Sequence, residues 1–168
     1  QMLISSPQFR AYYSDDLIGV EYGGILKNVI AIAAGILDAL ELGANAKAAL
    51  LVRGIAEMKR FALSQGAREE TLSGLSGFGD LITTCLGPQS RNYSVGFQIG
   101  KGETIQEIVS GMVAVAEGVK TSKVIALLAK QRGISMPITT AVYEVLYEKL
   151  PLEKAIGLLM TRDLKAED

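Results

Sequence analysis

Residues 17–40, LIGVEYGGILKNVIAIAAGILDAL, contain the most apolar stretch of the chain and decide its fold. Their apolar side chains occupy nearly every position around a helix, so no single polar face remains. A helix that is apolar on all sides is normally the buried centre of a domain. Glycine and alanine at positions 23, 24, 31, 34 and 35 leave room for other backbones to approach. The stretch therefore predicts a central helix surrounded by others.

The rest of the chain indicates further helices and one short strand. Hydrophobic residues make up 49% of the chain, only 6% is aromatic and tryptophan is absent, which is typical of packed helices. Alternating residues at 9–14 predict a strand, for which no later segment offers a partner. The predicted fold is thus an all-α, multi-helix domain with a short orphan strand at its N-terminus. Helical spacing and capping signals place the other helices at 45–65, 69–72, 81–85, 90–99, 104–107, 121–131, 137–149 and 151–160.

The composition excludes several chemistries. The 168 residues include no histidine and one cysteine, so a histidine base, a histidine-ligated metal and an intrachain disulfide are excluded. A formal net charge of −1 argues against a nucleic-acid partner. The longest uncharged apolar run, 29–37, is short of the roughly 20 residues that span a bilayer. With no signal-peptide pattern at the start, we expect a cytoplasmic protein without a membrane span.

Lys27 and Asn28 interrupt the most apolar helix of the protein. A lysine in such a place can extend along the helix flank so that its ammonium reaches water. The flanking turns are apolar on all sides, which favours a partly buried amine instead. Burial and neighbouring cations lower the pKa of a lysine amine and allow it to act as a general base. In a chain without histidine, Lys27 is the best candidate for a base.

Two short polar segments are further candidates. Residues 76–80, SGFGD, form a glycine-rich loop closed by Asp80, which either caps the next helix or belongs to a loop whose N–H groups approach a ligand. Residues 89–92, QSRN, bring a hydroxyl, a guanidinium and an amide to a helix start. That set suits a phosphate, although Ser90 could be an ordinary N-cap beside an exposed Arg91.

These segments, in this order, resemble the C-terminal domain of bacterial NAD(P)-dependent glycerol-3-phosphate dehydrogenases. The similarity runs from about residue 9 to the charged tail, and several collinear motifs make it specific. The matching motifs are GVEYGGILKNVIAI at 19–32, GANA at 43–46, RGIAEM at 53–58, GFGDLITTC at 77–85, SRN at 90–92 and AEGV at 116–119.

The resemblance implies a two-domain enzyme of which this chain is one half. Residues 16–168 would be the helical substrate-binding domain, similar in fold to the C-terminal domain of 6-phosphogluconate dehydrogenase. Residues 1–15 would be a remnant of the strand or linker from a missing N-terminal Rossmann domain, which holds most of the NAD or NADP site. Enzymes of this family interconvert dihydroxyacetone phosphate and sn-glycerol 3-phosphate for glycerophospholipid synthesis, and a homodimer is implied.

The resemblance also assigns roles to individual residues. By motif position, Lys27 matches the proton acceptor of the family. Substrate contacts are implied for Lys27, Asn28, Asp80, Ser90, Arg91 and Asn92. Cofactor contacts are implied for Arg91, Val115 and Glu117. Whether Asp80 contacts substrate or orients Lys27 stays open.

The main departure from the family pattern is that no strand–Gly-x-Gly-x-x-Gly–helix unit occurs in the sequence, so we expect the chain alone to be inactive. Phe78 also stands where an aliphatic residue is commoner. One alternative is the helical domain of another lysine-dependent dehydrogenase, of the ketopantoate or 3-hydroxy acid reductase type, although the phosphate-binding pattern at 90–92 argues against it. The other alternative is a stand-alone helical dimerisation module.

Overall fold

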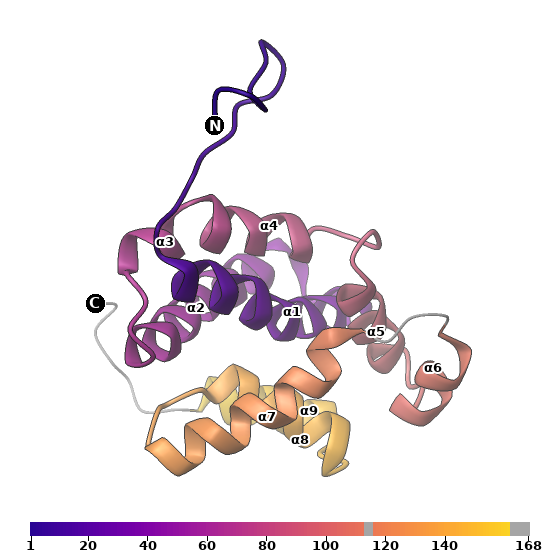
Figure 1. Ribbon diagram of the computed structural model, residues 1–168. Helices are drawn as coiled ribbons and strands as arrows, with labels where there is room; N and C mark the ends of the chain where they lie inside the picture. Colours follow the sequence, from indigo (N-terminus) through magenta and orange to yellow (C-terminus); the bar gives the residue numbers. More distant parts are fainter. Residues whose placement is uncertain (113–115, 162–168) are drawn as a thin grey trace.

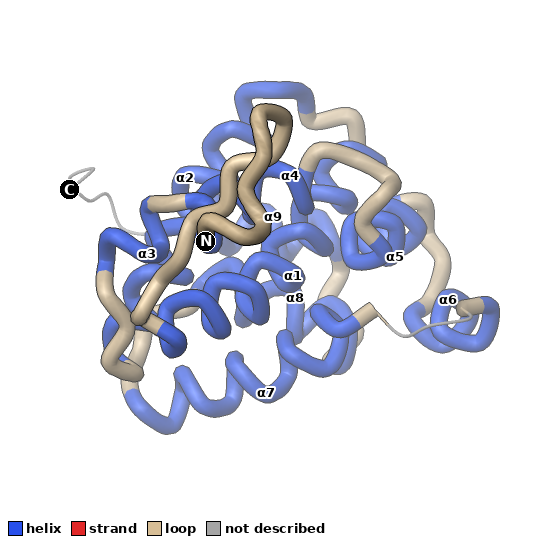
Figure 2. The backbone as a smooth tube through the Cα atoms, turned by 45° about the horizontal axis from the view of Figure 1, so that its top comes forward, coloured by secondary structure: helices blue, strands red, loops and turns tan. Residues whose placement is uncertain are grey.

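The central feature of the molecule is α1 (Leu17–Ala39), around which the other helices are arranged (Figure 1). The computed structural model describes residues 1–112 and 116–161. Within these residues all regular structure is helical, as predicted (Figure 2). The other elements are α2 (Gly43–Ser64), α3 (Glu69–Ser73), the π-helical turn η1 (Leu75–Gly79), α4 (Asp80–Cys85), α5 (Arg91–Gly100), α6 (Ile105–Gly111), α7 (Glu117–Arg132), α8 (Pro137–Tyr147) and α9 (Leu152–Met160).

The burial of α1 confirms the expectation of a central helix. Leu26, Val29, Ile30 and Ile32 are at most 1% exposed, although they point in different directions around the helix. Their side chains are divided between two hydrophobic clusters. Only the first cluster includes buried residues of α2, α3 and α4, whereas both clusters include residues of α5, α7 and α8.

Small residues allow α5 to pack directly on α1. A Cβ atom on Gly35 would lie 2.1 Å from the carbonyl oxygen of Tyr93, and one on Gly96 would lie 1.9 Å from that of Ile32. Both distances are impossible for a real side chain, so the two backbones touch only because glycine stands at both positions. The cost that these glycines impose on helix propensity is offset by this close packing.

The predicted N-terminal strand is wrong. Residues 1–15 extend away from the helices (Figure 1), and Ser6 and Phe9 form only an isolated bridge. The alternating pattern at 9–14 gives no strand because a strand needs a partner for its N–H and C=O groups, and the described part of the chain offers none beside it. The segment ends at Asp16, whose carboxylate accepts the N–H of Gly19 at 2.9 Å and caps α1.

Most helix boundaries lie within two residues of the predicted positions, but the loop predicted at 76–80 instead forms the π-helical turn η1 and the first residue of α4. The capping box of Thr104 and Glu107 is present, and Pro137 is the first residue of α8. By contrast α7 begins at Glu117, four residues before the predicted start. Its first turn is held from outside the helix, because the N–H of Gly118 donates to the side chain of Asn92 in α5.

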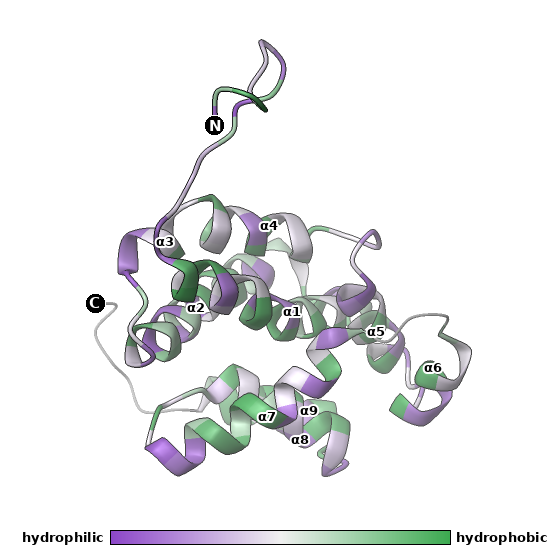
Figure 3. Cartoon of the chain, in the orientation of Figure 1, coloured by the Kyte–Doolittle hydropathy of each residue, from purple (hydrophilic) through white to green (hydrophobic). Residues whose placement is uncertain are grey.

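Helix α1 is long and apolar enough to cross a membrane by length and composition alone. An 18-residue window has a mean hydropathy of 1.4, and 56% of that window is buried inside the fold. In Figure 3 the largely hydrophobic α1 runs through the middle of the domain, with α4 on one side of it and α7 on the other. Packing within the domain therefore accounts for its apolar composition.

Candidate active site

An ion pair joins the centre of α1 to the start of α4. The ammonium of Lys27 donates to Oδ2 of Asp80, and the side chains are 19% and 39% exposed. Asp80 is the first residue of α4 and makes no capping hydrogen bond to its backbone, so the interpretation of Asp80 as an N-cap is wrong. The ammonium of Lys27 is thus neither free in bulk water nor unpaired in the core. It is paired with a carboxylate at the edge of the domain.

Thr84 is a third member of this group, and the sequence motifs alone do not single it out. Its hydroxyl lies 2.6 Å from the carbonyl oxygen of Asp80 and 3.4 Å from Oδ1 of the same residue. The spacing of four residues places Asp80 and Thr84 on one face of α4. That spacing was visible in the sequence and is the signal that could have identified Thr84.

Asn28 and Asn92 form a buried junction between three helices. The Asn92 amide donates to Oδ1 of Asn28 at 2.9 Å, and Oδ1 of Asn92 accepts the N–H of Gly118 at 2.8 Å. The Asn28 amide donates to the carbonyl oxygen of Gly24 at 3.0 Å. The junction connects α1, α5 and the start of α7, and it brings the neighbouring positions Arg91 and Glu117, both exposed, to the same region.

Ser90 and Arg91 lie at the first turn of α5. The hydroxyl oxygen of Ser90 accepts the N–H of Tyr93 at 3.2 Å, so Ser90 is the N-cap. Arg91 begins the helix and is exposed to solvent. A guanidinium beside a helix N-terminus is an arrangement that suits an anion, because both contribute positive charge and N–H donors. Val115, the remaining candidate, lies outside the described residues.

A second polar cluster lies further along α1, where Asp38 accepts hydrogen bonds from Lys47 and Tyr93, both at 2.6 Å. Burial and this hydrogen bond raise the pKa of Tyr93 to about 12. Burial alone would raise the pKa of Asp38, but the hydrogen bonds from Lys47 and Tyr93 outweigh it and lower that pKa. The interactions of Asp38 with Lys47 and Tyr93 therefore connect α1, α2 and α5 and stabilise the packing of these helices.

Cys85 is unsuited to nucleophilic chemistry. It is fully buried, and burial raises the pKa of its thiol to about 12 in spite of Lys47 and Lys27 nearby. A thiol with such a pKa stays protonated at neutral pH and is a poor nucleophile. Among the described side chains near α4, Lys27 remains the group best placed to exchange a proton.

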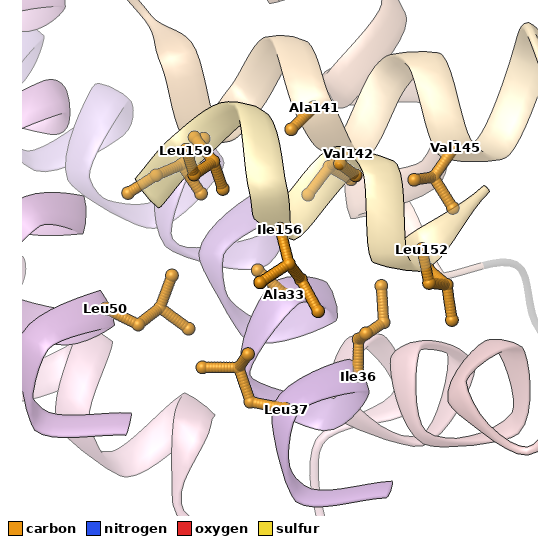
Figure 4. A pocket seen from close by; sticks show the side chains of 12 residues that line it. Ala33, Ile36, Leu37, Leu50, Ala141, Val142, Val145, Leu152, Ile156 and Leu159 are labelled. Atoms are coloured by element: carbon orange, nitrogen blue, oxygen red, sulfur yellow. The ribbon is translucent and has the colours of Figure 1, made fainter. Parts of the chain in front are cut away.

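Two exposed charged side chains, Arg91 and Glu117, stand next in sequence to Asn92 and Gly118 of the buried junction. Arg91 and Glu117 offer an exposed cation and an exposed carboxylate, which fit a phosphate and a hydroxyl group respectively. An apolar cavity of about 60 Å³ lies between α1, α2, α8 and α9 (Figure 4), and a hollow of about 710 Å³ lies between α7, α8 and α9. Neither is lined by Lys27, Asp80 or Arg91.

The fold and the ordered motifs place the chain among the helical C-terminal domains of dehydrogenases. Residues 16–157 match the family model described as NAD-dependent glycerol-3-phosphate dehydrogenase C-terminus. That match covers most of the chain, so the chain belongs to this family.

Known relatives are similar over nearly the whole chain. The glycerol-3-phosphate dehydrogenase [NAD(P)+] of Geobacter sulfurreducens is 53% identical over 167 residues, which are 99% of this chain and 50% of that protein. The enzyme of the same name from Staphylococcus carnosus is 50% identical, and the match again covers 99% of this chain and 50% of that protein. The chain therefore spans about half the length of the curated relatives it matches.

Solved structures confirm the fold. The crystal structure of glycerol-3-phosphate dehydrogenase from Coxiella burnetii superposes with a TM-score of 0.89 at 42% identity, covering 95% of this chain and 49% of that one. The DsGPDH structure of Dunaliella salina gives a TM-score of 0.81 at 29% identity, covering 94% of this chain and 32% of that one.

Proposed function

We propose that this chain is the substrate-binding half of an NAD(P)-dependent glycerol-3-phosphate dehydrogenase and supplies its catalytic lysine. The whole enzyme would interconvert dihydroxyacetone phosphate and sn-glycerol 3-phosphate for glycerophospholipid synthesis. The observation that carries the proposal is the pairing of Lys27 with Asp80 in a chain of this family. The two residues are far apart in sequence and meet at the edge of the helical domain.

Lys27 exchanges the proton of the reaction in this proposal. When the ketone is reduced, the ammonium stabilises the negative charge that develops on the C2 oxygen and then donates a proton to it. When the alcohol is oxidised, the neutral amine accepts the C2 hydroxyl proton. The hydride on C2 is exchanged with NAD(P), which is the chemistry the cofactor supplies when bound.

Asp80 and Arg91 would position the reactants. Asp80 holds the Lys27 ammonium through their ion pair and, being 39% exposed, can also accept a hydrogen bond from a substrate hydroxyl. Arg91 would bind the phosphate with its forked N–H groups. Fixing the phosphate, which does not react, holds C2 in place for the transfer and so contributes to the rate.

Ser90, Asn28 and Asn92 would be neutral donors in the substrate site. Ser90 uses its oxygen as a cap and keeps its hydroxyl proton for another acceptor. The amide nitrogens of Asn28 and Asn92 each carry two hydrogens, and one hydrogen bond from each is accounted for by the junction. The second hydrogen of each is the one we assign to substrate.

The cofactor would bind between this domain and a partner domain. We propose that Arg91, Val115 and Glu117 contact NAD or NADP from this side, and that the main site is in an N-terminal Rossmann domain of the same enzyme. The support is that the chain spans about half the length of its relatives, named as NAD(P)+ enzymes. We further propose a cytoplasmic homodimer, to which exposed apolar side chains on α7 and α9 such as Val124 and Leu158 offer surface.

The test is a substrate assay of the complete enzyme and its Lys27→Ala variant. The enzyme is expected to reduce dihydroxyacetone phosphate with NADH or NADPH, and to leave ketopantoate and 3-oxo acids unreacted. Lys27→Ala should lower kcat by about 10² to 10⁴, the usual contribution of a general acid–base group. A loss of less than about tenfold would show that Lys27 is not that group, and faster turnover of ketopantoate would contradict the proposed substrate.

A further inference from the structure

The turn that precedes Asp80 lies directly on the backbone of α1. At Gly23, one helical turn before Lys27, a Cβ atom would stand 2.3 Å from the carbonyl oxygen of Ser76 and 3.6 Å from the Cα of Gly77. Contacts under 3.0 Å are essentially never made by real Cβ atoms. At the neighbouring Gly24, a Cβ atom would meet nothing within 4 Å, so the close approach is specific to one face of α1.

The same turn is also confined on its other side. A Cβ atom on Gly77 would lie 2.1 Å from the carbonyl oxygen of Leu72, a residue of α3 that is fully buried. The turn η1 is therefore held between two backbones, that of α1 and that of α3. It cannot take up a side chain at position 23 without moving.

The residues of the backbone contact and those of the ion pair are separated by the same number of residues on α1 and on the segment formed by η1 and α4. Gly23 and Lys27 are four residues apart on α1, and Ser76 and Asp80 are four residues apart across η1 and the start of α4. Residues four apart lie on the same face of a helix. The backbone contact and the ion pair are thus successive links between α1 and the segment formed by η1 and α4, and α4 runs alongside α1 in Figure 1.

We propose that Gly23 is a positioning residue for the reaction. Its missing side chain keeps η1 against α1 and thereby places the carboxylate of Asp80 next to Lys27. This inference rests on the proposed role of Lys27. In Gly23→Ala, the oxygen of Ser76 must move from 2.3 Å to beyond 3.0 Å, a displacement of at least 0.7 Å. Misplacement of reacting groups by about 1 Å can lower rates by about 100-fold.

The first test compares single alanine variants of the complete enzyme. Gly23→Ala is expected to lower kcat/KM for dihydroxyacetone phosphate by about 10-fold to 100-fold, mainly through kcat. Gly157→Ala in α9 is the matched control, because its Cβ atom would meet nothing within 4 Å. The control should keep kcat/KM within about twofold of the wild type. Wild-type activity in Gly23→Ala would overturn the inference.

The second test asks whether a longer carboxylate compensates for the wider gap. Asp80→Glu adds one methylene, so by itself it should lower kcat/KM, but combined with Gly23→Ala it should raise kcat/KM well above that of Gly23→Ala alone. A role of Gly23 in stability alone predicts independent effects that multiply within about twofold. Multiplicative losses would therefore overturn the inference.

A third variant keeps the test decisive if Gly23→Ala does not fold, as judged by its thermal melt. Gly77→Ala displaces the same turn from the α3 side, so it should lower kcat/KM mainly through kcat in a variant that still melts cooperatively. A folded Gly77→Ala variant with wild-type kcat would overturn the inference. Failure of the proposed function would look different: the wild-type enzyme would not reduce dihydroxyacetone phosphate, or Lys27→Ala would stay active.

Discussion

Lys27 combines an apolar neighbourhood with a charged partner. Its neighbours in sequence, Leu26 and Asn28, are buried, and its own side chain is 19% exposed. An ammonium in such a place is stable only with a compensating charge or hydrogen bonds, and Asp80 provides both. At the level of single residues, the ion pair therefore explains how a lysine can stand in the central helix of the domain.

The exposed Arg91 leads to a prediction about substrate recognition. Arg91→Lys keeps the charge but removes the forked donor geometry, so KM for dihydroxyacetone phosphate should rise about 10-fold or more. The preference for dihydroxyacetone phosphate over dihydroxyacetone should fall by a similar factor, because only the phosphorylated substrate uses this contact. Steady-state kinetics with both substrates measures the effect.

Arg132→Lys is the matched control for Arg91→Lys. Arg132 is an exposed guanidinium in the last turn of α7, where it bonds the side chain of Gln65. This variant should retain the wild-type preference for the phosphorylated substrate. An unchanged preference in Arg91→Lys would show that the phosphate is bound by other residues.

The start of α8 illustrates how one element is fixed by another. The carboxylate of Glu57, a residue of α2 that is 2% exposed, accepts the N–H groups of Ile138 and Thr139 and the Thr139 hydroxyl. Burial raises the pKa of Glu57 to about 7, although these hydrogen bonds and the charge of Arg60 favour its ionised form. Glu57 is therefore a buried acid that satisfies the first turn of a distant helix.

This raised pKa gives a prediction for stability against pH. Between about pH 4.5 and about pH 7 the folded chain binds a proton at Glu57 that the unfolded chain has released. The contribution of this group to the free energy of unfolding is thus fully present below about pH 4.5 and is lost as the pH rises to about 7. The loss amounts to about 3 kcal/mol. Glu57→Gln should remove this dependence, as measured by thermal melting from pH 4.5 to 8.

The exposed Glu153 in α9 provides the control for this experiment. Glu153→Gln should leave the pH dependence of the melting temperature as it is in the wild type, because Glu153 lies on the surface. If the wild type and Glu57→Gln melt with parallel pH profiles, Glu57 titrates alike in the folded and unfolded chains and the prediction is wrong.

The whole molecule is a packed helical domain whose candidate active-site residues lie at its edge. Lys27, Asp80 and Arg91 are all partly or fully exposed, and the cavity of about 60 Å³ lies elsewhere in the domain. Catalysis requires groups that surround the substrate and exclude water. In the function proposed above, a second domain would supply the groups that complete the site.

We therefore predict that the isolated 168-residue chain folds but does not catalyse the reaction. Circular dichroism should show a helical protein with a cooperative melt. Its rate of dihydroxyacetone phosphate reduction should be indistinguishable from a blank without protein, while the complete enzyme is active under the same conditions. Turnover by the isolated chain that disappears in Lys27→Ala would contradict this prediction.

Much of the fold could be predicted from the sequence because helices are specified locally. The apolar residues of α1, the capping box of Thr104 and the proline at 137 act within a few positions, and each predicted helix is present. The strand at 9–14 was predicted on the same kind of local pattern and is absent. A strand depends on hydrogen bonds to a neighbouring chain segment, which a local pattern does not contain.

The candidate site, like the fold, could be predicted from the sequence only in part. The sequence by itself determined which residue types were available: a lysine in an apolar helix, a carboxylate after a glycine loop, and an arginine at a helix start in a chain without histidine. Only the tertiary structure decided that Lys27 meets Asp80, that Asn92 caps α7, and that Gly23 touches Ser76. The reason is physical: each of these contacts joins segments 26 to 53 residues apart, and packing of whole helices, not local preference, brings them together.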